Sequence, residues 1–65
     1  MENKESDIIA NLLCDIKDSL RSGNYHNANI IWSKIEDHGW DKEIVPGKLA
    51  ASKGSVFVSI YNGPY

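Results

Sequence analysis

Residues 56–61, Val-Phe-Val-Ser-Ile-Tyr, constrain this chain most, because they predict a strand that is apolar on both faces. A strand without neighbours leaves its backbone N–H and C=O groups open to any other strand. Little in the remaining sequence is an obvious complement for it. We therefore expect this strand to pair within the 65-residue chain, with a second copy or with another protein. Each of these outcomes favours a function in binding.

The small size of the chain limits how it can be stabilised. A domain of 65 residues buries only about 60% of the surface that its unfolded chain exposes. A disulfide is excluded because Cys14 is the single cysteine. Cys14, His26 and His38 do not make a four-ligand zinc set, so we expect neither metal nor cofactor. Association with a second copy or a partner is the remaining route to stability.

The charge distribution disfavours a simple nucleic-acid-binding protein. The net charge is −2, whereas binding to a phosphate backbone depends on lysine and arginine. Residues 1–45 carry five basic and nine acidic side chains, and residues 46–65 carry Lys48 and Lys53 without any acid. This pattern predicts an acidic body with a mildly basic tail.

The distribution of apolar residues disfavours a membrane protein. No run approaches the ~20 apolar residues of a membrane-spanning helix. Residues 1–5 are polar and charged, unlike a signal peptide. We therefore expect a soluble cytoplasmic protein.

Two amphipathic helices are predicted, at residues 6–22 and 25–38, after a frayed N-terminus at residues 1–5. Ser6 is a suitable N-cap for the first helix, and Gly23 a suitable terminator. Asn24 can cap the second helix, and Gly39 followed by Trp40 is typical of a Schellman motif. The short connection predicts an antiparallel hairpin. Apolar residues at helical spacing predict its core: Ile9, Leu12, Leu13, Ile16, Ile31, Trp32 and Ile35.

The connection between these helices resembles part of a known repeat. Residues 20–28, Leu-Arg-Ser-Gly-Asn-Tyr-His-Asn-Ala, followed by Trp32, resemble the turn between the two helices of a tetratricopeptide repeat. The resemblance covers about a third of the chain, and a solenoid needs about three repeats. It implies the geometry of a close-packed hairpin and carries no expectation of peptide binding.

The remainder of the chain predicts a short β segment. Residues 41–45 are compatible with a strand, and Pro46-Gly47 favours a type II turn. We expect residues 46–54 to form a turn or loop, with one helical turn at 48–53, leading to a C-terminal strand at 55–61. The predicted fold class is α+β, mainly α, in a single domain.

No combination of residues provides a catalytic signature, so we expect a non-enzymatic protein. The main hypothesis is a protein–protein interaction module that acts as an inhibitor, adaptor or antitoxin-like regulator of a larger protein. Small proteins of this type are common among phage and mobile-element accessory proteins, which is an analogy of type. The residues expected to contact a partner are Val56, Val58, Ile60, Tyr61, Trp40 and Ile30.

We also expect a homodimer, formed either by a four-helix bundle or by strands 55–61 paired across a twofold axis. The alternative hypothesis is a nucleic-acid-binding regulator built as a dimeric helical bundle. For that function Lys48 and Lys53 would act together with Phe57 and Tyr61, since aromatic rings stack on bases.

Overall fold

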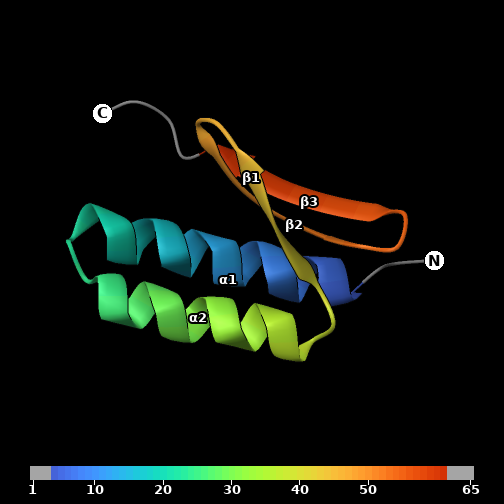
Figure 1. Cartoon of the computed structure of the whole chain (residues 1–65), viewed down its shortest axis with the longest axis horizontal. Coiled ribbons are helices and arrows are strands. Elements are labelled where there is room, and N and C mark those ends of the chain that lie inside the picture. Colours follow the sequence, from blue (N-terminus) through green and yellow to red (C-terminus); the bar gives the residue numbers. More distant parts are fainter. Residues whose placement is uncertain (1–3, 62–65) are drawn as a thin grey trace.

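Two helices pack beneath a three-stranded antiparallel sheet (Figure 1). The computed structural model describes residues 4–61, without the side chain of Ile44. The elements are α1 (Lys4–Arg21), α2 (Tyr25–Asp37), β1 (Asp41–Val45), β2 (Lys48–Lys53) and β3 (Val56–Tyr61). The predicted α+β class, the helical hairpin and the C-terminal strand are confirmed.

The hairpin turn is formed by Gly23 and Asn24. Gly23 has a φ of +78°, and the Gly23 and Asn24 amides donate to the carbonyls of Leu20 and Ser19. This pair of bonds is a Schellman motif that closes α1. Asn24 then caps α2, because its side chain accepts a hydrogen bond from the Asn27 amide at 3.2 Å.

The start of α1 differs from the prediction. The helix includes Lys4 and Glu5, so Ser6 lies inside the first turn and is not the N-cap. Residues 4–5 are therefore helical rather than frayed, and residues 1–3 lie outside the described part of the chain.

The end of α2 follows the predicted Schellman motif. The Gly39 amide donates to the Glu36 carbonyl, and the Trp40 amide donates to the Ile35 carbonyl. Gly39 has a φ of +82°, a conformation that favours glycine. The motif turns Trp40 back into the core, where its side chain is only 2% exposed.

The prediction of a loop at residues 46–54 was wrong for its central part. Residues 48–53 form β2, the middle strand, and only Pro46-Gly47 and Gly54-Ser55 are turns. The Lys-Leu-Ala-Ala-Ser-Lys sequence of this strand favours a helix by propensity. Tertiary packing prevails because Ala50 and Ala51 are both completely buried, between two neighbouring strands.

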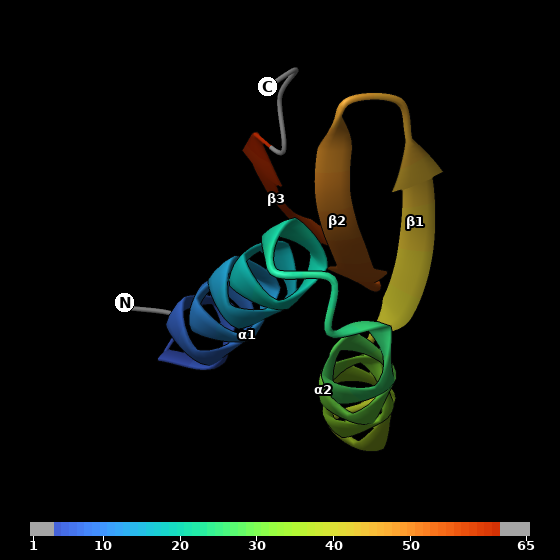
Figure 2. The ribbon, with the colours of Figure 1, turned by 90° about the vertical axis from the view of Figure 1, so that its left-hand side faces the viewer.

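The core lies between the helix layer and the inner face of the sheet. α2 packs against β1, whereas α1 packs against β2 and β3, crosses beneath β3 and extends past it at the N-terminal end of the helix (Figure 2). The buried cluster includes most of the predicted core, but Leu12 and Trp32 are only partly buried against it. Its members are Ile9, Leu13, Ile16, Ala28, Ile31, Ile35, Trp40, Leu49 and Ala51.

Candidate interaction surface

The alternation of β3 divides its side chains between the core and solvent. Val56, Val58 and Ile60 are partly buried and pack against the core cluster. Phe57, Ser59 and Tyr61 point to the outer face of the sheet and are exposed. The strand that is apolar on both faces therefore satisfies only one face within the described part of the chain.

The outer face presents two large aromatic side chains. Phe57 is 56% exposed and Tyr61 is 64% exposed. In the sheet register Ala50 lies opposite Ser59, and Lys48 lies opposite Tyr61. Ala50 is completely buried although it is outside the core cluster. The centre of this face is thus a small buried residue between Glu43 and Ser59, with the two aromatic side chains on its β3 side.

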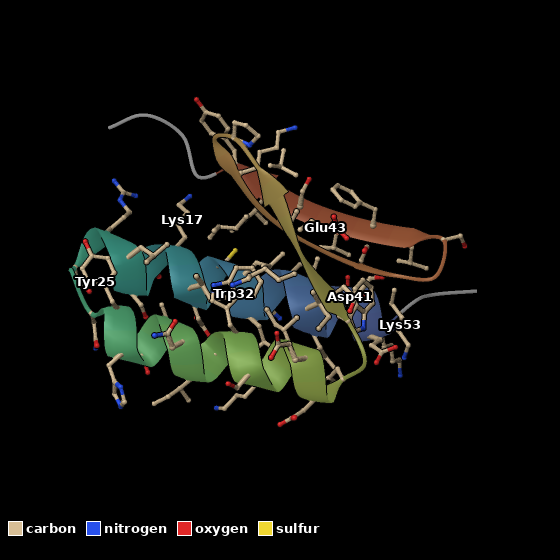
Figure 3. All side chains as sticks on the ribbon, in the orientation of Figure 1. Lys17, Tyr25, Trp32, Asp41, Glu43 and Lys53 are labelled. Carbon is tan, nitrogen blue, oxygen red and sulfur yellow. The ribbon has the colours of Figure 1, made fainter. Side chains whose placement is uncertain are left out.

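Acidic residues occupy the β1 side of the same face. The Ser52 hydroxyl donates a hydrogen bond of 2.7 Å to Glu43 Oε2, which fixes this carboxylate against β2. Asp41 is exposed at the start of β1. The outer face therefore runs from acidic groups on β1 (Figure 3) to the aromatic rings of Phe57 and Tyr61, with Ser59 between them, on β3.

The strand order leaves β1 and β3 at the two edges of the sheet. Each hairpin has a two-residue loop, closed by Val45–Lys48 and by Lys53–Val56. A tight turn hydrogen-bonds the two residues that flank it, and hydrogen-bonded pairs then alternate along an antiparallel ladder.

This rule determines which backbone groups face the open edge of β3. In β3, Val56, Val58 and Ile60 hydrogen-bond to β2. The backbone groups of Phe57, Ser59 and Tyr61 therefore point to the open edge. The two hairpins are consistent with each other, because the residues of β2 that hydrogen-bond to β1 then alternate with those that hydrogen-bond to β3. The open edge and the exposed aromatic side chains thus belong to the same residues.

A polar contact anchors the end of β2 to α1 and to the C-cap of α2. Lys53 Nζ lies 3.2 Å from Glu5 Oε1 on α1, and donates to the carbonyl of the C-cap residue His38 at 3.3 Å. The hydrogen bonds from Lys53 lower the pKa of Glu5, desolvation opposes this shift, and the Trp40 indole lowers the pKa to a smaller extent. The Trp40 indole N–H is buried and makes no hydrogen bond within the described residues.

The residues predicted to contact a partner lie in different parts of the structure and do not form one surface. Trp40 is a core residue, which corrects its assignment to a binding surface. Val56, Val58 and Ile60 turn their side chains inward, so their side chains are largely committed to the core. Tyr61 is exposed on the outer face, and Ile30 is 44% exposed on α2. Since α2 packs against β1 and not β3, Ile30 does not join Tyr61 in one patch.

The sequence placed Phe57 on a surface only in the nucleic-acid alternative, and Phe57 was not among the residues predicted to contact a protein partner. Its alternation with Val56 and Val58 was visible, but which face pointed inward depended on the unpredicted strand β2.

The described residues do not suggest a metal site or a membrane span. No group of three or more His, Cys, Asp or Glu side chains within residues 4–61 is arranged to hold a metal ion. Neither α1 nor α2 is long and apolar enough to cross a bilayer. Cys14 is exposed on α1 as a free thiol.

Comparison with known proteins gives no relative. No protein-family model, curated protein sequence or solved structure matches this chain. The function must therefore be argued from the surface itself.

Proposed function

We propose that this chain is a non-enzymatic interaction module that binds a larger protein through β3 and regulates it as an inhibitor, adaptor or antitoxin-like regulator. The main observation in support is that β3 is an uncharged edge strand. The residues whose backbone groups face the open edge include the two exposed aromatic residues. Edges of this kind are recurrent sites of strand addition, in which main-chain hydrogen bonds provide affinity. Exposed Tyr and Phe side chains are typical of the centre of protein interfaces.

The same observations support a protein partner over nucleic acid. Lys53 is engaged by Glu5, which leaves Lys48 as the lysine beside the aromatic residues of β3. Asp41 and Glu43 share the outer face, and their charges oppose a phosphate backbone. A cytoplasmic, phage or mobile-element context remains part of this proposal, as does self-association.

The proposal is tested by capture from lysate of the natural host with matched variants. Wild-type chain should recover one protein at about equal amounts, and Ser59→Pro should lose it, because proline removes an edge N–H and obstructs the approach of a strand. Ile30→Ser is the control, since it alters an exposed apolar side chain on α2. Recovery of nuclease-sensitive material in place of a protein would support the nucleic-acid alternative. Recovery of the same protein by Ser59→Pro would contradict the role of β3.

A further inference from the structure

We propose that the occupant of the β3 edge is an extended, helix-free segment of another protein, which adds a fourth strand above the uncovered flank of α1. The inference rests on the proposed function, because it concerns the same edge. It adds the form of the partner, the residues beneath it and the charge expected at one of its ends.

The position of α1 provides a surface beneath the open edge of β3. Seen along the helices, α1 crosses beneath β3 and its N-terminal half extends past the open edge (Figure 2), whereas α2 packs against β1 at the other edge. Neighbouring strands lie about 4.8 Å apart. A strand added to β3 would therefore lie above α1 and would have a helix surface to pack on.

The surface of α1 on this side is formed by one stripe of residues. Ser19 lies on the α2 side of α1, because its hydroxyl accepts a hydrogen bond of 2.7 Å from Asn27 Nδ2. Ala10, Cys14 and Lys17 are spaced to form one stripe about half a turn away from Ser19. Cys14 is exposed, and the other two are half-buried. This flank, Ala10–Cys14–Lys17, is small and apolar at its centre, as a covering strand requires.

Positive charge lies near the Tyr61 end of the β3 edge. The Lys53–Glu5 contact places the start of β3 near the start of α1, and both elements run in the same direction (Figure 1). At about 3.3 Å per strand residue and 1.5 Å per helix residue, Tyr61 is roughly level with Lys17. Lys17 projects toward the sheet side (Figure 3), and Lys48 lies opposite Tyr61.

The two lysines favour an acidic group on the partner at the Tyr61 end. Opposite charges across an interface steer association and fix the direction of binding. The alternating backbone pattern of β3 adds a second requirement, because the partner must offer N–H and C=O groups to Phe57, Ser59 and Tyr61. The expected segment is therefore extended, free of proline at its pairing positions, apolar toward α1 and acidic at one end.

A second copy fits this position less well. Antiparallel pairing of two β3 strands keeps both helix layers on the same side of the joined sheet. Each copy would then bring its own α1 under the junction, where the other α1 already extends past the edge. Helix axes need 8–10 Å of separation. A segment without a helix avoids this conflict.

The experiment is a selection from a displayed library of short linear peptides, followed by footprinting of Cys14. Enriched peptides should alternate apolar residues and carry an acidic residue at one end. Their affinity for Ser59→Pro should fall by about tenfold or more, because the substitution removes the Ser59 N–H donor and the proline ring obstructs the approaching strand. Circular dichroism verifies that the variant folds. Synthetic chain with an N-methyl group on Ser59 provides the same test without the proline ring.

Bound peptide should also slow alkylation of Cys14 by a maleimide, because the added strand covers this thiol. The matched control is Ile30→Cys in a Cys14→Ser background, whose alkylation rate should not change. Lys17→Glu should weaken the acidic peptides and leave binding of neutral ones unchanged.

Three results would overturn the inference. They are the absence of any enriched peptide, equal binding to Ser59→Pro, or unchanged alkylation of Cys14. Protection of Cys14 at high protein concentration without peptide would assign the edge to a second copy. A protein from lysate could bind wild type but not Ser59→Pro, and yet leave the alkylation of Cys14 unchanged. That result would support the proposed function and contradict a strand that lies above α1.

Discussion

The two edges of the sheet differ in how they are protected. The β1 edge carries Asp41, Lys42 and Glu43, and Lys42 Nζ lies 5.4 Å from the centre of the Trp32 ring on α2. The β3 edge carries no charged residue within Val56–Tyr61. Charged side chains on an edge strand discourage pairing with other chains. The difference favours the β3 edge as the proposed site of strand addition.

Trp40 and Trp32 support β1 to different extents. Trp40 directly precedes β1 and is 2% exposed, whereas Trp32 is only partly buried beneath it. Trp40→Ala should cost about 3–5 kcal/mol and unfold a domain of this size. Trp32→Ala should cost less and leave a folded protein. Urea unfolding followed by circular dichroism makes the comparison, and an equal loss for both variants would place Trp32 in the core after all.

Proline substitutions separate the two sides of β3. Val58→Pro removes a hydrogen bond to β2, and the unpaired carbonyl alone should cost about 1–3 kcal/mol. Ser59→Pro removes an N–H that faces the open edge, so its cost should stay within about 1 kcal/mol. Thermal unfolding of the two variants measures the contrast. A greater loss for Ser59→Pro would mean that the hydrogen-bond alternation is inverted.

A single substitution should weaken the protection of the β1 edge, although Asp41 and Glu43 remain. Lys42→Thr removes a charge from β1 and introduces a residue that favours strands. We expect association that increases with concentration, measured by light scattering. Lys34→Thr on α2 removes the same charge away from the sheet and should not associate. If neither variant differs from wild type, charge on β1 is not what protects that edge.

The ion pair between Lys53 at the end of β2 and Glu5 should have the smallest effect. The pKa of Glu5 is lowered below 4.5 in the folded protein, so its contribution to stability is present at neutral pH and is lost as the pH falls through the folded pKa. Glu5→Gln should lower the Tm slightly at pH 7, since exposed ion pairs stabilise little. The difference from wild type should vanish in acid. A difference that persists in acid would mean that Glu5 acts by packing.

The sequence predicted the helices better than the sheet because their signals are local. Gly23, Asn24 and Gly39 act within one turn of the chain, and all three form the predicted turn or cap. Strand β2 was not predictable from its own residues, because Ala50 and Ala51 favour helices and are placed in a strand only by their neighbours.

The residues of the candidate site were predicted only in part, because their exposure depends on the pairing of the strands. Tyr61 was expected at a contact surface and is exposed, whereas Trp40 was expected there and is buried. The type II turn at Pro46-Gly47 was predicted, and Gly47 has the required positive φ of +73°. That turn and Gly54 together set the register, which decides that Phe57 and not Val58 faces solvent.

Residue-resolved amide hydrogen exchange of dilute protein shows whether Phe57, Ser59 and Tyr61 present their backbone groups to an open edge. We expect alternation along β3, with slow exchange at Val58 and Ile60 and fast exchange at Ser59. Equally slow exchange at Ser59 and Val58 in dilute protein would show that the edge is already covered and that β3 is not open to a partner.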